Sequence, residues 1–332
     1  SGTSSTITAG PGALNDFTLT TQNSQTETAG TSFSVTATAR DVEQNTKTNY
    51  TGSKSVAWTW TATGSPGGDA PTKPADGNET FSSGAMTRTG FTLTDAGETP
   101  TITITADANS GTTASITVNP AAANKLSFST QPSSSATAGT NFSTQPAVTV
   151  QDQYSNTVTG SSASIMLAAV LASDGTTAGS GTLNTTTNPL AASSGTATFA
   201  GVSYTVAESI KLKATATGLT QTLSNTIAVS ALTISSVSAS TTSSGASIIW
   251  TTNAAASSKV DYGLTNSYGS STTETDTSPR VTSHSVTISN LVACSTYHYR
   301  VRSTAAGGNE TIDTDNTFST TGCVGSATIN SQ

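Results

Sequence analysis

Charged side chains are scarce in this sequence of 332 residues: Asp, Glu, Lys and Arg together make up 9% of it. Aromatic residues reach only 5%, and there are two histidines and two cysteines. The low charge argues against general disorder, which usually combines weak hydrophobicity with high net charge. The net charge is −7 and the 12 Lys and Arg are scattered, so the chain lacks the basic stripe that binds nucleic acid. We therefore expect no nucleic-acid partner.

Long apolar segments and helical periodicity are also missing. No apolar run approaches the roughly 18 residues of a membrane span, and apolar residues never recur at helical spacing over three turns. We expect neither a membrane span nor a signal peptide, and the start at Ser1 without Met suggests a processed or excised form. What the sequence has instead is 71 Thr and 52 Ser. Because β-branched Thr suits the exposed face of a strand, this composition predicts an all-β fold.

An internal repeat organises the first two thirds of the chain. The segment 17–33 aligns without gaps on 126–142, and the segment 82–97 aligns on 193–208. The shared period of about 110 residues is the size of one β-sandwich. Glycines coincide in both alignments, which marks common turns or bulges: Gly30 with Gly139, Gly84 with Gly195, and Gly90 with Gly201.

Within each repeat, short runs alternate apolar and polar residues as half-buried strands do. The runs "ITITA" (102–106) and "IKLKA" (210–214) each place their apolar side chains on one face. The run "SVAWTW" predicts Val56 and Trp58 in a core, with Trp60 in that core or nearer its rim. We expect three tandem β-sandwiches with these boundaries: a surplus N-terminal strand or linker at 1–15, related sandwiches at 16–119 and 120–230, a third at 231–325, and a tail at 326–332.

Three features of the second repeat carry a resemblance to a known family: "QP…ATAGT", the turn Asp152-X-X-X-Asn156, and "SGTATF". With them, residues 124–230 resemble the Ig-like repeats of large prokaryotic surface proteins and adhesins, and residues 15–119 do so more loosely. The family usually has Gly before that Asn, where this chain has Ser155. The resemblance implies spacers or scaffolds whose motif carries no activity.

The last third of the chain differs from the repeats. The stretches "ASIIWTTNAAASSKVDYGLTNSYG" and "ISNLVACSTYHYRVRSTAAGG" make residues 231–322 similar to a fibronectin type III domain. This resemblance implies that Trp250 is the core tryptophan of the second strand. It also implies a tyrosine corner, in which the Tyr297 hydroxyl bonds to upstream backbone near Leu291.

Residue clusters that could carry catalysis are missing from the sequence. His284 and His298 lie in Ser/Thr-rich strands, where we expect them to be exposed, and no His-X-X-X-His or Cys-X-X-Cys spacing accompanies them. No Gly-X-Ser-X-Gly elbow, phosphate loop or pair of acids in a pKa-shifting context stands out. We therefore predict that the chain is not an enzyme and has no cofactor.

Two Asp-X-X-X-Asn turns are the one place where we consider a metal. Asp41 with Asn45, and Asp152 with Asn156, offer oxygen ligands of the kind that Ca²⁺ accepts. Such side chains more often cap their own backbone in Asx turns. Calcium at these four residues is therefore a secondary expectation.

The cysteines and sequons bear on location. A disulfide between Cys294 and Cys323 would place the protein in an oxidising, extracellular or cell-surface setting, and free buried thiols are the alternative. Five Asn-X-Ser/Thr sequons leave glycosylation open, and they begin at Asn49, Asn78, Asn141, Asn184 and Asn309.

The first residues look like part of another sandwich. "STITAGPGALND" (5–16) aligns on "ASITVNPAAANK" (114–125), which resembles the closing strand of one sandwich and the linker into the next. Each predicted sandwich already owns a closing strand. Residues 1–15 are thus either a leftover of a longer array, or a strand, with Ile7, Ala9 and Pro11, that adds to a sheet edge of another copy. Repeated head to tail, the second arrangement generates an open filament.

These observations favour a non-enzymatic extracellular structural protein, the self-associating protomer of a cell-surface filament, sheath or layer. One alternative is the spacer or ligand-binding region of a large surface adhesin, in contact with carbohydrate or cell wall. Another is the accessory part of a secreted hydrolase. The adhesin alternative predicts aromatic residues clustered at one end of a domain, whereas Trp60, Tyr262 and Tyr268 are scattered in the sequence.

Overall fold

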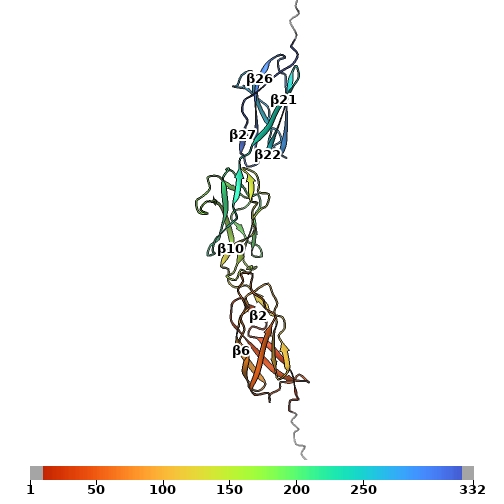
Figure 1. Cartoon of the computed structure of the whole chain (residues 1–332), viewed down its shortest axis with the longest axis vertical. Helices are drawn as coiled ribbons and strands as arrows, with labels where there is room; N and C mark the ends of the chain where they lie inside the picture. The colour runs from red at the N-terminus through yellow and green to blue at the C-terminus, as the bar shows by residue number, and fades with distance from the viewer. Residues whose placement is uncertain (1–9, 324–332) are drawn as a thin grey trace, which may run out of the picture.

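A computed structural model describes residues 10–323 of the chain. Three β-sandwiches follow one another along the long axis of the molecule (Figure 1). The fold is all-β, as the Thr-rich composition predicts: residues 10–323 form strands, turns and loops and no helix. Accordingly, no helix in this range is long and apolar enough to cross a membrane.

The first module contains two sheets and a separate parallel strand pair. The parallel pair joins the second strand of the module to its closing strand. In sheet order, the strands are β1 (Leu14–Thr21), β3 (Phe33–Asp41) and β6 (Ala85–Phe91) in one sheet, β5 (Gly77–Phe81), β4 (Gly52–Trp60), β7 (Ile102–Ala106) and β8 (Asn109–Thr112) in the other, and β2 (Thr26–Thr28) with β9 (Thr117–Asn119) in the pair.

The second module repeats this plan. Its closing strand β20 again runs parallel to its second strand, β11. The strands are β10 (Lys125–Thr130), β12 (Ala147–Gln151) and β16 (Thr196–Thr198) in one sheet, β11 (Ser135–Thr137), β20 (Ile227–Ser230), β18 (Ser209–Thr215), β13 (Ser164–Leu171) and β15 (Leu190–Ala191) in the other, with β19 (Thr222–Leu223) on β18 and a pair of β14 (Leu183–Asn184) with β17 (Ser203–Tyr204).

The third module closes differently. Its last strand pairs antiparallel with β26 alone, and its first strand lies at a sheet edge. One sheet contains β21 (Ile234–Thr241), β22 (Gly245–Ala256) and β25 (Val281–Ser289), and the other contains β24 (Ser270–Ser271), β23 (Lys259–Gly263), β26 (Thr296–Thr304), β27 (Glu310–Ile312) and β28 (Asn316–Ser319).

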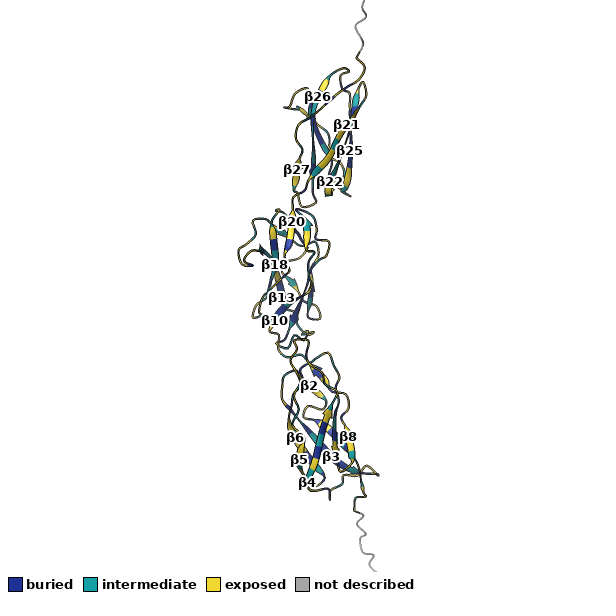
Figure 2. Cartoon of the chain, viewed as in Figure 1, coloured by how far each residue is buried: buried dark blue, intermediate teal, exposed yellow. Residues whose placement is uncertain are grey.

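Each module has its own apolar core, and buried residues line the inside of each sandwich (Figure 2). In the first module, Val56 and Trp58 of β4 are buried as their alternation predicts, and Trp60 lies half-buried against the same core. In the third, Trp250 is buried and its indole N–H donates to the Ser303 hydroxyl at 2.9 Å. The Tyr297 hydroxyl accepts from the Val292 N–H at 3.0 Å, which is the corner contact that the resemblance implied.

Candidate assembly surfaces at the module ends

The Asp152–Asn156 turn, which follows β12, holds the linker between the first two modules. The Asp152 carboxylate accepts N–H groups of its own turn, from Tyr154 and Asn156, each at 2.9 Å. Its second oxygen accepts the N–H of Ala121 in the linker, also at 2.9 Å. The side chain therefore fixes the turn and the entering chain together, as an Asx cap does.

Asn156 extends this turn across the module boundary. Its Nδ2 donates to the Thr94 carbonyl of the first module at 2.9 Å, and its Oδ1 accepts the Ala96 N–H at 3.0 Å. The Gly67 N–H donates to the Tyr154 carbonyl at 3.0 Å. Asn156 is only 3% exposed, so these bonds are shielded from water. Three hydrogen bonds thus tie the turn of one module to loops of the preceding one.

Gly30 receives the Tyr154 ring at the same junction. Tyr154 packs against the core of the first module, and a Cβ at Gly30 would overlap its hydroxyl. Gly30 also has φ +74°, a conformation that favours glycine. The glycine that the repeat alignment singled out is therefore a point of contact between modules.

The second junction uses the equivalent glycine. Gly139 has φ +76°, and its carbonyl accepts the Gly307 N–H of the third module at 2.7 Å. The Asn309 side chain of the third module donates to the Thr205 carbonyl of the second. Both Ig-like modules therefore offer the loop with the matched glycine to the module that follows, although the partner residues differ.

The Asp41–Asn45 turn of the first module repeats the geometry of the Asp152–Asn156 turn. The Asp41 carboxylate accepts the N–H groups of Glu43 at 3.0 Å and Asn45 at 2.9 Å, and its other oxygen accepts the Gly12 N–H at 2.9 Å. The Gly12 bond is the largest of the causes that lower the pKa of Asp41 below its usual 3.8. Residues 10–13 are thus held as the linker 119–122 is held in the second module.

The residues predicted for an assembly strand are only partly within the described range. Ile7 and Ala9 lie outside the described residues. Pro11 is half-buried and precedes β1 without belonging to a strand. Their role as a donated strand stays a prediction.

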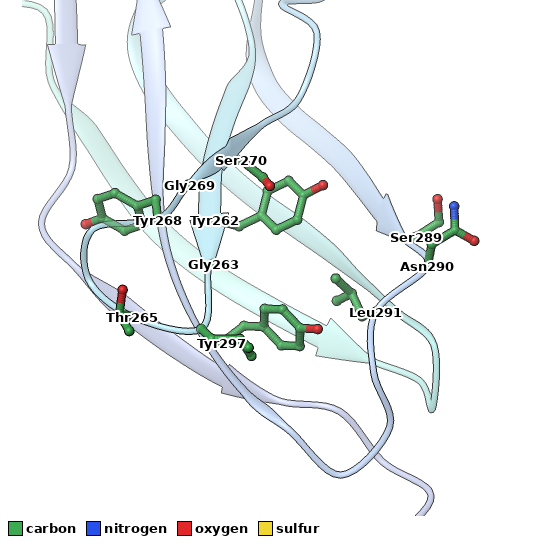
Figure 3. Close-up of a pocket in the computed structure, with 11 residues that line it drawn as sticks. Tyr262, Gly263, Thr265, Tyr268, Gly269, Ser270, Ser289, Asn290, Leu291 and Tyr297 are labelled. Carbon is green, nitrogen blue, oxygen red and sulfur yellow. The ribbon is translucent and has the colours of Figure 1, made fainter.

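A hollow lies at the far end of the third module, between the loops after β23 and β25. Tyr262, Tyr297 and Leu291 surround it, with Tyr268 on the loop beside them (Figure 3). Arg300 lies 4.7 Å from the centre of the Tyr268 ring, in a cation–π contact. Tyr262 and Tyr268, which look scattered in the sequence, therefore line one surface, whereas Trp60 lies in the first module.

The Cys294–Cys323 disulfide lies next to this hollow. It joins the loop after β25 to the end of the described chain, with Cα atoms 4.8 Å apart. The Cys294 N–H also donates to the Thr321 carbonyl at 3.2 Å. The loops at this end of the molecule are therefore tied together covalently as well as by hydrogen bonds.

The oxygens considered for calcium are used by the backbone. In both Asp-X-X-X-Asn turns the carboxylate accepts two N–H groups of the turn and one of the preceding linker. Among residues 10–323 no group of three or more His, Cys, Asp and Glu side chains is placed to hold a metal. Four of the sequon asparagines are exposed, namely Asn49, Asn78, Asn141 and Asn184, whereas Asn309 is engaged by the second junction.

The expectation of an exposed His284 is wrong. The imidazole is buried, stacks on Trp250 with ring centroids 4.9 Å apart, and has a pKa lowered by that burial. Its Nδ1 lies 2.7 Å from the Ser258 hydroxyl, which also bonds to Asp276. Burial overrides the polar sequence context because the ring covers one face of the core tryptophan. His298 is half-buried, with Nδ1 2.7 Å from Asp315.

This Ser–His–Asp set has the residue types of a hydrolase triad but not its arrangement. In a triad the histidine lies between the serine and the aspartate. Here Ser258 bonds to both partners itself and is fully buried, so no substrate reaches its hydroxyl. The cluster is therefore a satisfied polar network inside the third module.

Two groups of contact residues were missed by sequence reasoning. The junction role of Asn156 and Tyr154 needs the neighbouring module to be in place, although the repeated Asp-X-X-X-Asn spacing marked the turn. The hollow brings Tyr262 and Tyr268 together with Tyr297 from another strand. Two tyrosines flanking one short loop were the available signal.

Comparison with known proteins adds support at the level of the fold. No protein family matches the sequence, and no curated protein matches it. Three solved structures show similar chains. The Escherichia coli adhesin FdeC is 15% identical, with a TM-score of 0.39 over 94% of this chain and 99% of that one. The FN1–FN3 domains of chicken CNTN1 are 10% identical, with a TM-score of 0.30 over 93% and 99%.

The third is the Yersinia pseudotuberculosis adhesin InvE, which is 19% identical, with a TM-score of 0.26 over 69% of this chain and 67% of that one. Identities this low concern the fold alone. Together with the strand topology, they are consistent with a chain of tandem Ig-like and fibronectin type III sandwiches.

Proposed function

We propose that this chain is a non-enzymatic structural protein of the cell surface, which forms a rod and polymerises end to end into a filament, sheath or layer. The observation that carries the proposal is the pair of junctions, where backbone and side-chain hydrogen bonds tie each module to the next. Contacts of this kind limit bending between domains, which otherwise move by default. A disulfide at one end suits an oxidising, extracellular setting.

Strand donation by residues 5–9 is the proposed means of polymerisation. In the first two modules, the closing strand pairs parallel with the second strand of the same module. In the third, β28 pairs with β26, and within residues 10–323 the outer edge of β21 has no strand partner. An extended segment adds main-chain hydrogen bonds along such an edge. The segment with the sequence of a closing strand therefore has a suitable acceptor in a second copy.

Deletion of residues 1–9 tests this function. We expect the intact chain to form fibres visible by negative-stain electron microscopy, and the shortened chain to remain monomeric with an unchanged circular dichroism spectrum. Fibres that form equally well after the deletion would exclude strand donation. An intact chain that stays monomeric at every concentration would exclude the filament and leave a spacer.

The adhesin alternative has one observation in its favour. The hollow of the third module presents Tyr262 and Tyr268, and tyrosine rings bind partners through large, rigid, amphipathic surfaces. A sugar ring is the ligand that this alternative predicts. Binding of the intact chain to a glycan array, lost in Tyr268→Ala, would favour the adhesin over the filament.

A further inference from the structure

The free end of the third module corresponds to the end of the first module that receives the second. In the first module, the contacts come from the loops after β2, β4 and β6, which contain Gly30, Gly67 and Thr94. The corresponding loops of the third module are 242–244, 264–269 and 290–295, after β21, β23 and β25. The last two of these loops line the tyrosine hollow. The hollow therefore occupies the place where the internal junction seats an Asp-X-X-X-Asn turn.

Exposed apolar side chains are concentrated at the two ends of the molecule. Within residues 10–323 the three most exposed large hydrophobic residues are Val42 at 68%, Leu264 at 63% and Val292 at 63%. Val42 lies in the turn of the first module, and Leu264 and Val292 lie in the loops around the hollow. The four others, on the sides of the modules, are less exposed: Met166, Leu223, Ile249 and Ile312.

The turn at the first end is a copy of a turn that is already docked. Asn45 occupies the position of Asn156, but it is exposed and its amide bonds only to Asp41, at 3.3 and 3.4 Å. Asn156 uses the same group to bond the loop of a neighbouring module. The Asp41–Asn45 turn thus presents a docking geometry without a docked partner among the described residues.

We propose that the hollow of the third module accepts the Asp41–Asn45 turn of a second copy, head to tail. Val42 packs against Leu264 and Val292, and the Asn45 amide bonds to backbone of the loop 290–295, as Asn156 does at Thr94 and Ala96. The residues that line the hollow include no carboxylate, so Glu43 of the turn meets no like charge there. The contact is heterologous and repeats into an open filament. The inference rests on the proposed polymer and names the surfaces that meet in it.

A pair of complementary variants tests this contact. Val42→Asp blocks the turn but leaves the hollow free, and Leu264→Asp blocks the hollow but leaves the turn free. Both side chains are mostly exposed, so melting temperatures should stay unchanged. We expect each variant alone to sediment as a monomer, and an equimolar mixture to form one-to-one dimers and nothing larger. Ile249→Asp, at a side position that is 48% exposed, is the matched control and should polymerise normally.

The outcomes separate this contact from strand donation. Each blocked variant should weaken association about tenfold or more, the loss expected when an apolar contact is replaced by a buried charge. Fibres from Val42→Asp and Leu264→Asp, with loss of fibres after deletion of residues 1–9, would overturn the contact and leave the proposed function intact. Loss of glycan binding in Leu264→Asp without any effect on sedimentation would assign the hollow to a sugar and also overturn it.

Discussion

The turns Asp41–Asn45 and Asp152–Asn156 have the same spacing and the same backbone geometry, yet they have different surroundings. Each aspartate accepts two N–H groups from its own turn and one from the linker that precedes the module. In the second module, the neighbouring sandwich covers the turn and buries Asn156; in the first, Asn45 is exposed. The difference teaches that the motif encodes a cap locally and becomes a junction only when another module supplies the loop.

Removing the cap from the covered turn should have the largest effect. Asp152→Ala leaves three backbone N–H groups without their acceptor in a site with no exposed surface, and we expect a loss of about 3 kcal/mol in the stability of the second module. Hydrogen exchange of the amides in β12 and β13, followed by mass spectrometry, measures this loss.

Asp41→Ala is the matched control for that prediction. Its turn faces water, which can bond to the freed N–H groups, so exchange in the first module should accelerate less. Equal acceleration in the two variants would show that the neighbouring module contributes nothing to the turn.

Removing the amide that crosses the boundary should have a smaller effect. Asn156→Ala leaves the Thr94 carbonyl and the Ala96 N–H unpartnered, at a cost of about 1–2 kcal/mol to the docking of the two modules. The junction should then bend more, and small-angle X-ray scattering should report a shorter mean length. Asn45→Ala should leave the scattering curve of the monomer unchanged. A straight rod in both variants would mean that Tyr154 over Gly30 is sufficient to hold the junction.

The sequence predicted the sandwiches well because the alternation of apolar residues records burial directly. Trp58 and Ile104 are buried where the pattern placed them. The pattern also marked Gly30, Gly139 and both Asp-X-X-X-Asn turns, but as turns and candidate calcium ligands rather than as junctions. Contacts between modules depend on surfaces that are exposed in an isolated module, and exposed residues carry no periodicity. His284 was misjudged for a related reason, since its burial depends on Trp250 of a neighbouring strand.

The smallest effect concerns protonation of the exposed turn. Because the Gly12 N–H and the turn N–H groups bond to the carboxylate, the pKa of Asp41 lies below 3.8 in the folded chain. The anchoring of residues 10–13 should therefore be complete above pH 3.8 and be lost only as the pH falls through the lower, folded value. The amide proton shift of Gly12, followed by NMR, should be constant from pH 7 to about pH 5 and move with a midpoint below 3.8.

Asp41→Asn should abolish this midpoint, because the amide does not titrate in that range. A Gly12 midpoint at or above 3.8 would mean that the carboxylate is not held by the linker. The comparison of the two turns would then fail at its first element, the shared grip of each aspartate on the chain that enters its module. The leading segment would no longer be positioned like a linker, and its delivery to the sheet of another copy would lose its structural basis.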